Sequence, residues 1–413
     1  MSGVLFALDN RRLFLFGFAK NNFGGSLQPA SFTRIISIKN MQIGFVSDLE
    51  LQASGGGSYA VNWHAFRQME RYFEAAYGGP VVPKAAVVDN CISKVRRKIL
   101  KRPGKFAYFS PATLDENARV IGNKVVANAD ALFFRSATPW CRYRPEVPYF
   151  IYLDAVFHTF FHNTFRPENF IGSDLERIWR EEAEFLEGAA AVFFESAWGM
   201  EMAINAYGLQ GNHYHAVGRG GVIDPPEDDG WDGTSLKLVT LAMKFHQKGG
   251  DLVLEAYRML KPRFPSLSWH IIGGPPEGDW QSLGGIHYEG VIRPDETEGK
   301  KRMSQLLSQA FLLVHPTRED VNPLVPTEAA YFGCPTISVN RFALPELVLD
   351  GKTGLLLEPP VTAEVLAAAI ESLITDRTGY LEMRRQARDY AMENYQWDRI
   401  GDTMAGVMRE RMG

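Results

Sequence analysis

The sequence predicts an α/β protein of two domains, each a parallel sheet with helices on its faces. Its 413 residues exceed the size of one ordinary domain. Short apolar runs of strand length alternate with segments of helical periodicity along most of the chain, as in parallel sheets crossed by helices. Residues 225–233 are acidic and rich in proline and glycine, as linkers are, so we place the domain boundary there.

The composition indicates a globular protein of a reducing, cytoplasmic compartment. Hydrophobic residues make up 46% and charged residues 22% of the chain, which is ordinary for soluble domains. The formal net charge of −4 argues against general nucleic-acid binding. Three scattered cysteines have neither metal nor disulfide spacing. The sequence shows no apolar run of the roughly 18 residues that a membrane span needs.

Residues 1–40 precede the expected fold. They hold one short apolar piece, 13–19, behind two arginines, without a convincing cleavage site for a signal peptide. We therefore expect a poorly ordered extension. Met41 opens the first expected strand, 42–47, and is itself a candidate start of the native protein.

A glycine-rich turn follows this first strand. It includes Gly55 and Gly56 and leads into a helical pattern at 59–77. Glycines at such a junction let the backbone approach a ligand beside a helix N-terminus. Because hairpins and linkers have similar turns, it is the position after the first strand that makes this turn a candidate ligand contact.

Further apolar runs extend the sheet of the first domain, which we place at 41–224. They lie at 129–134 and 149–153, and Asp154 and His158 follow the second run. Both side chains are candidates for a ligand contact, with Asp154 the first choice. A histidine among phenylalanines, as His158 is, is more often a core residue than a functional one.

The segment Ile92–Lys105 predicts a short basic helix with one apolar stripe, ended by a proline and a glycine. Two arrangements are open. In the one that we expect, the stripe packs on the domain and the basic face is solvated. In the alternative, the helix lies on an anionic membrane surface at the inner face of the membrane.

The second domain is expected over 225–394, and it begins with a strand at 236–241. Lys248 and two glycines then lead into a helix that Asp251 or the second glycine can cap. A lysine beside the free backbone donors of a helix start favours an anion site. Lys248 is therefore a candidate for binding phosphate.

The stretch 311–335 combines a buried strand, a polar loop and a helix that ends at a glycine. Asp320 lies in the loop after the strand, and Glu328 lies near the first turn of the helix. Open α/β sheets bind ligands at this edge. Backbone donors around 321–325 and the two carboxylates suit an anionic ligand rich in hydroxyl groups.

This stretch resembles the signature of the retaining glycosyltransferases of family 4, which have the GT-B architecture. Their pattern is an acid, seven residues, Glu-Ala and then Gly-x-Pro; here these are Asp320, Glu328-Ala329 and Gly333-Cys334-Pro335. The family usually has Glu at the first acid and Gly-Phe-Gly after it, whereas this chain has Asp320 and Val-Asn-Pro, which bears on the sugar preference. The resemblance runs from about Met41 to the end of the chain.

The resemblance implies two Rossmann-like domains with parallel sheets facing across a cleft, the first completed by a C-terminal helix at 395–413. It implies transfer of a hexose from a nucleotide-diphosphate sugar to a glycan or lipid-linked acceptor. Metal-dependent transferases use a DxD-type motif, which we do not find in the sequence, so we expect no metal and no other cofactor. The alternatives are a sugar-nucleotide epimerase of the same fold and a non-catalytic relative that only binds nucleotide sugar.

The same resemblance implies the roles of particular residues. Asp320 would hold the donor sugar and Glu328 the ribose, while Asp154 or His158 would contact the sugar from the first domain. Lys244 is the nearest substitute for a basic residue that the family has before its Lys-Gly pair. The expected donor contacts are Gly55, Gly56, Lys244, Lys248, Asn322, Leu324, Val325 and Glu328.

Overall fold

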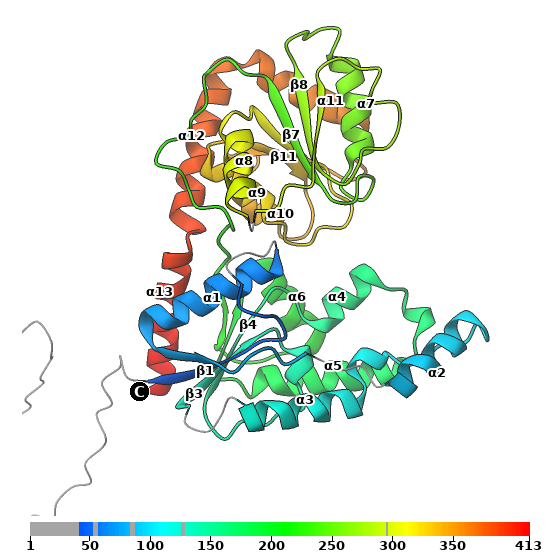
Figure 1. The fold of residues 1–413 in the computed structure, drawn as a ribbon, viewed down its shortest axis with the longest axis vertical. Helices are drawn as coiled ribbons and strands as arrows, with labels where there is room; N and C mark the ends of the chain where they lie inside the picture. Colours follow the sequence, from blue (N-terminus) through cyan, green and yellow to red (C-terminus); the bar gives the residue numbers. More distant parts are fainter. Residues whose placement is uncertain (1–40, 53–56, 83–86, 125–128, 295) are drawn as a thin grey trace, which may run out of the picture. The chain divides into compact units, whose positions relative to one another are not determined.

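The computed structural model describes residues 41–52, 57–82, 87–124, 129–294 and 296–413. Two six-stranded sheets lie in one compact unit (Figure 1). Every strand pair in both sheets is parallel. The expected α/β class with two parallel sheets is confirmed.

The first sheet has the strand order β2-β1-β3-β4-β5-β6. Its strands β4 and β5 are buried along their whole length because helices cover both faces of the sheet. The strands are β1 (Gln42–Val46), β2 (Glu74–Tyr77), β3 (Ala131–Arg135), β4 (Tyr149–Leu153), β5 (Ala191–Phe194) and β6 (Tyr214–Ala216). The helices are α1 (Ser58–Tyr72), α2 (Val87–Lys98), α3 (Pro111–Lys124), α4 (Phe157–Thr164), α5 (Gly172–Glu187) and α6 (Ala197–Tyr207).

One expected boundary in this domain is wrong. The helical pattern at 59–77 includes two elements, since α1 ends at Tyr72 and residues 74–77 form β2. Phe73 is extended, and Glu74–Tyr77 pair with β1 at the edge of the sheet. Tertiary pairing has therefore overridden the helical periodicity of the last turn.

The second sheet has the order β12-β11-β10-β7-β8-β9. The strands are β7 (Lys237–Ala242), β8 (Ser268–Gly273), β9 (Ile286–Gly290), β10 (Leu312–His315), β11 (Thr336–Val339) and β12 (Gly354–Leu357). The helices are α7 (Gly250–Leu260), α8 (Thr297–Ser308), α9 (Val325–Tyr331), α10 (Leu344–Leu347), α11 (Ala363–Thr375) and α12 (Arg377–Asn394). The chain runs outward from β7 to β9 and returns to β10, so the strand order switches between β7 and β10. Such a switch point opens a crevice at the carboxyl ends of the strands.

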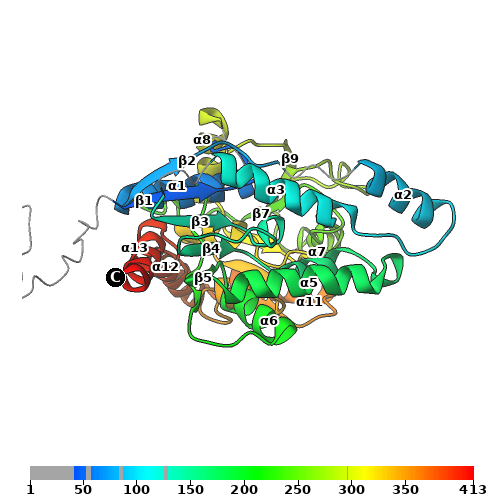
Figure 2. The same cartoon turned by 90° about the horizontal axis from the view of Figure 1, so that it is seen from below.

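The last helix, α13 (Trp397–Met412), belongs to the core of the first domain. Ile400, Met404 and Met408 are buried against residues of β1, β3 and α1, and α13 runs beside α1 while α12 lies along the second domain (Figures 1 and 2). Trp397 Nε1 donates a hydrogen bond of 2.8 Å to the carbonyl of Gly221. In the part of the chain that the structure describes, no helix combines the length and apolarity that crossing a bilayer demands.

We expect Met404→Ala to lower the free energy of unfolding by about 2–5 kcal/mol, because it removes a fully buried side chain and leaves a cavity. Urea unfolding would measure this. The neighbouring exposed Thr403→Ala is the control, with an expected change within about 0.5 kcal/mol. Equal effects of the two substitutions would show that α13 does not stabilise the first sheet.

Candidate functional site

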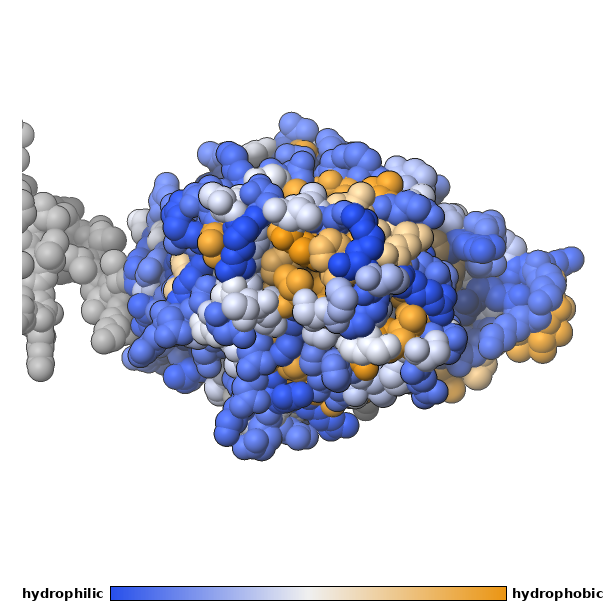
Figure 3. Space-filling model, turned by 90° about the horizontal axis from the view of Figure 1, so that it is seen from above, coloured by the Kyte–Doolittle hydropathy of each residue, from blue (hydrophilic) through white to orange (hydrophobic). Residues whose placement is uncertain are grey.

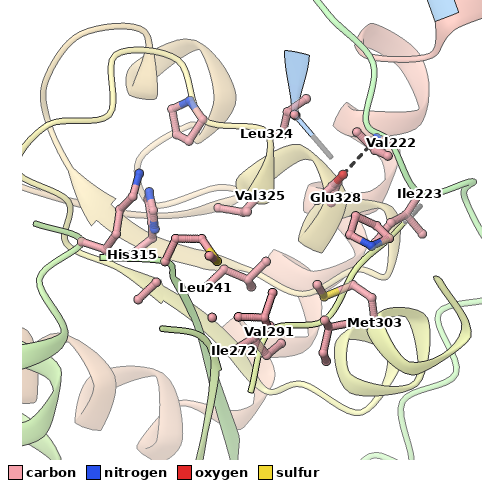
Figure 4. A pocket seen from close by; sticks show the side chains of 18 of the residues that line it. Val222, Ile223, Leu241, Ile272, Val291, Met303, His315, Leu324, Val325 and Glu328 are labelled. Atoms are coloured by element: carbon pink, nitrogen blue, oxygen red, sulfur yellow. Dashed lines mark hydrogen bonds between the residues drawn. The ribbon is translucent and has the colours of Figure 1, made fainter. Parts of the chain in front are cut away.

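A cavity of about 590 Å³ opens at the switch point of the second sheet (Figure 4). The ends of β7 and β8, the loop after β9, and the segment from β10 into α9 line it. Val222 and Ile223, from the segment that joins the two sheets, close one side, and Gly57 at the start of α1 also reaches it. The cavity therefore lies where the topology predicts a ligand site.

One wall of this cavity is apolar. Leu241, Ile272, Val291 and Met303 come from β7, β8, the loop after β9 and α8, and Figure 4 shows them grouped together. Arg293 also lines the cavity and is exposed. Ligand sites commonly combine such apolar walls with a few polar groups. The wall suits a flat, weakly polar ring.

Three charged or titratable side chains cluster at the opposite side. Asp320 forms a hydrogen bond of 2.8 Å with Nε2 of His315 through Oδ2, and Lys248 Nζ donates to its Oδ1. His315 ends β10 and is buried, and Thr317 Oγ1 accepts the backbone N–H of Asp320 at 3.1 Å. Although burial raises the pKa of Asp320, His315 and Lys248 hold it well below its usual range. Asp320 is therefore a carboxylate whose two oxygens are already engaged.

A glycine places Lys248 in this cluster. Gly249 has φ 78°, and a Cβ at this position would lie 2.3 Å from the carbonyl oxygen of Pro316. The loop after β7 can therefore approach the loop after β10 only with glycine here. Lys248 has three donor hydrogens, so it can bind Asp320 and still donate into the cavity.

Glu328 is buried in the first turn of α9 and lines the same cavity. Its Oε1 accepts the backbone N–H of Val222 at 2.9 Å, as Figure 4 shows. Burial raises the pKa of the carboxyl group, and the hydrogen bonds from Val222 and Ile223 oppose this. Glu328 thus joins the second domain to the segment that leads into it.

A second cavity of about 460 Å³ adjoins the first and shares Asp320 with it. Asp154, at the end of β4, lines this second cavity, and its Oδ1 accepts from Asn322 Nδ2 at 3.0 Å. Burial, followed by the charge of Glu195, raises the pKa of Asp154 to about 6. Lys244 lines the second cavity as well. Residues of both domains therefore meet here.

Two partly buried arginines, Arg135 and Arg219, form ion pairs where the two domains meet. Glu195 forms ion pairs of 3.0 Å with Arg135 and 2.7 Å with Arg219. Arg219 also donates to the carbonyl of Asn322, which lies in the loop between β10 and α9. The position of that loop is therefore linked to the first sheet.

The structure brings together most, though not all, of the expected site residues. Lys248, Asp320, Leu324, Val325 and Glu328 line the first cavity. Asn322, Asp154 and Lys244 line the second. His158 is absent from the lining of both cavities, and its ring lies 4.2 Å from that of His162 and 5.0 Å from that of Trp179 between centroids. Gly55 and Gly56 lie outside the described residues.

Sequence reasoning missed three residues of the site. His315 is the last residue of β10, five residues before Asp320, and only this position at a strand end could have indicated a role in the site. Arg219 precedes two glycines in a stretch that indicates only a connection between domains. Arg293 lies in a loop without a motif. Within the described ranges, no group of three or more His, Cys, Asp or Glu side chains is placed to bind a metal ion.

Residues 226–394 match the family model for glycosyl transferases group 1. A GDP-mannose-dependent alpha-(1-6)-phosphatidylinositol monomannoside mannosyltransferase of Mycolicibacterium smegmatis is 27% identical over 184 residues, which cover 42% of this chain and 48% of that protein. A glycogen synthase of Mycobacterium tuberculosis is 27% identical over 39% of each chain. The chain thus spans about half, or less, of the length of these curated relatives.

Solved structures share the fold over nearly the whole chain. Sucrose-phosphate synthase from Thermosynechococcus elongatus has a TM-score of 0.64 at 14% identity, covering 90% of this chain and 98% of that one. Anabaena HepE, solved in complex with UDP, has a TM-score of 0.58 at 14% identity, covering 90% and 100%. The protein therefore has the two-domain GT-B fold of these solved structures, and residues 226–394 resemble the glycosyl transferases group 1.

Proposed function

We propose that the protein is a retaining glycosyltransferase. It moves a hexose from a nucleoside-diphosphate sugar to a hydroxyl group of a glycan or lipid-linked acceptor, without a metal ion. The observation that carries the proposal is the cavity at the switch point, which combines one apolar wall with Lys248, Asp320 and Glu328. An apolar ring, a diphosphate and a set of hydroxyl groups are the parts of a nucleotide sugar that these surfaces complement.

The donor would lie with its base against the apolar wall and its diphosphate beside Lys248. Glu328 would accept hydrogen bonds from the ribose, since each carboxylate oxygen has two lone pairs and can bind a hydroxyl group while it holds Val222. The charge that develops on the leaving diphosphate needs fixed positive groups. Lys248 supplies one at the cavity wall, and Arg293 is a second cation within the lining.

The acceptor would enter the second cavity, which shares Asp320 with the donor site. In the transfer, the bond between the anomeric carbon and the diphosphate oxygen breaks, and the acceptor oxygen bonds to that carbon on the same face. The acceptor proton passes to the leaving diphosphate. No protein nucleophile takes part in this scheme. Asp154 and Asn322, which are hydrogen-bonded to each other across the two domains, would together orient sugar hydroxyl groups in this cavity.

The names of similar proteins support a nucleotide sugar as the donor. The mycobacterial mannosyltransferase is named as GDP-mannose-dependent, and HepE is solved with UDP and with UDP-glucose. These names differ in the base. The apolar wall would contact the face of either base, and binding measurements with UDP, GDP and ADP identify the one that the protein takes.

We expect one nucleoside diphosphate among UDP, GDP and ADP to raise the melting temperature selectively, with and without magnesium, because Lys248 can meet the diphosphate charge. Its sugar conjugate should bind by calorimetry and support transfer to a glycan acceptor. Binding without transfer to any acceptor would favour the non-catalytic alternative. Turnover of the donor without acceptor, to an epimer, would favour the epimerase. A strict requirement for magnesium would contradict the metal-independent scheme.

We expect Lys248→Met to weaken binding of that nucleoside diphosphate about 10- to 150-fold, because a hydrogen bond to a charged group is lost. Lys244→Met is the matched control: it removes the same charge from the second cavity, and we expect at most about a twofold change in diphosphate affinity. Calorimetry measures both. A larger effect at Lys244 would place the diphosphate on the other side of Asp320.

The raised pKa of Asp154, about 6, predicts a pH dependence of stability. The folded protein keeps this proton more tightly than the unfolded chain, so the contribution of Asp154 to stability is complete below about pH 4 and is lost as the pH rises through 6. Relative to Asp154→Asn, which stays neutral, the wild type should lose on the order of 3 kcal/mol between pH 4 and pH 7. Urea unfolding at several pH values measures this difference. The exposed Asp228→Asn is the control, and an equal pH dependence of that variant and Asp154→Asn would contradict the prediction.

A further inference from the structure

Helix α2 packs on its domain through polar side chains and exposes its apolar ones. Val88, Ile92 and Val95 of α2 have exposed fractions of 69%, 53% and 46%, and Ile99, in the turn that continues it, has 71%, whereas Ser93 is 1% exposed. A helix on a globular protein normally has the opposite arrangement. The expectation that the apolar stripe packs on the domain is therefore wrong.

Close contacts on the inner side of α2 explain this orientation. Ser93 Oγ donates a hydrogen bond of 2.6 Å to the carbonyl of Lys105, and a Cβ at Gly104 would lie 2.4 Å from that Oγ. Arg97 places its guanidinium 4.9 Å from the ring centre of Phe170. A small residue, a glycine and an inward-facing arginine therefore determine which side of α2 faces the domain.

Basic residues border the exposed stripe on both sides. At about 100° per residue, Val88, Ile92, Val95 and Ile99 share one narrow face, and Arg96 and Lys98 lie about a quarter-turn to either side. Within the described residues, Lys94, Arg96 and Lys98 form no ion pair. Seven basic residues and one acid lie between Val87 and Lys105, although the whole chain has a net charge of −4.

The position of α2 leaves this face open. Figure 2 shows α2 projecting beyond the neighbouring helices of the first domain. Figure 3 shows apolar side chains beside hydrophilic ones on the side where α2 lies. An apolar stripe with cations on both sides is the arrangement by which helices lie in the interface of an anionic membrane. The stripe enters the headgroup region, and the cations contact lipid phosphates.

We propose that α2 docks the first domain on the surface of an anionic lipid bilayer, with Val88, Ile92, Val95 and Ile99 inserted and Lys94, Arg96 and Lys98 at the headgroups. The charge pattern favours this occupant over a second copy of the chain. A symmetric pair would bring the same basic residues of two copies together, and like charges repel across an interface. The inference does not depend on the proposed transfer reaction.

The test is sedimentation of the full chain with vesicles of phosphatidylcholine containing about a third phosphatidylglycerol, compared with vesicles of phosphatidylcholine alone. We expect binding to the anionic vesicles that weakens with salt. Lys94→Glu/Lys98→Glu and, separately, Ile92→Asp/Ile99→Asp should each reduce it by at least about tenfold. The residues changed are exposed, so the thermal melts of both variants should match the wild type.

The matched controls change exposed residues of the second domain. Lys301→Glu/Lys352→Glu alters the charge equally, and Val365→Asp/Leu381→Asp removes apolar side chains of similar exposure, 47% and 46%. Both controls should bind like the wild type. No binding to anionic vesicles, equal binding by the α2 variants, or equal binding to neutral vesicles would overturn the proposal. A dimer in solution that Ile92→Asp/Ile99→Asp dissolves would also overturn it, because the stripe would then bind a second copy.

Discussion

The site depends on one carboxylate that holds two loops together. Asp320 lies after β10 and Lys248 after β7, and their ion pair joins the loops on either side of the switch point. His315 engages the other oxygen of Asp320. Without this carboxylate, Lys248 would lose its counter-charge and Nε2 of the buried His315 would lose its hydrogen-bond partner, which is costly away from water. Asp320 therefore sets the shape of the cavity before any ligand arrives, and this preorganisation lowers the cost of binding.

Carboxylates also connect the two sheets, and each is met by backbone or amide donors of the other domain. Glu346, in α10, accepts the backbone N–H groups of Ala197 and Trp198 at 2.7 and 2.5 Å. These groups begin α6, where the helix dipole favours a negative charge. Conversely, Asp154 of the first domain accepts a hydrogen bond from the side-chain amide of Asn322 in the second domain. Water can replace polar contacts of this kind, and the proposed transfer would need the two sheets to separate and approach in this way.

The sequence predicted the parts of the site that rest on local patterns. Asp320 and Glu328 follow from a strand, a loop and a helix within 25 residues, and the position of Lys248 follows from one loop before one helix. His315 could not be found in this way, because its role depends on how the loop folds back onto the end of β10. The sequence also led us to expect Lys244 beside Lys248 at the donor site, but the two lysines, four residues apart in one loop, line different cavities. Which lysine faces the first cavity is determined by the turn at Gly249, which only glycine can adopt so close to Pro316.

The orientation of helix α2 is a second feature that local sequence patterns could not predict. Its periodicity correctly marks one apolar stripe, but periodicity alone does not say which side of a helix faces the domain. The side that faces the domain is determined by the close contact between Ser93 and Gly104. A pattern of hydrophobic residues does not show such a contact, because it depends on the small size of the two residues. Once they are buried, geometry turns Ile92 and Val95 outward, where they contribute little burial energy to the folded chain. Exposed apolar patches of this kind are typical of interaction sites, and the cations beside this one favour the anionic surface that we propose.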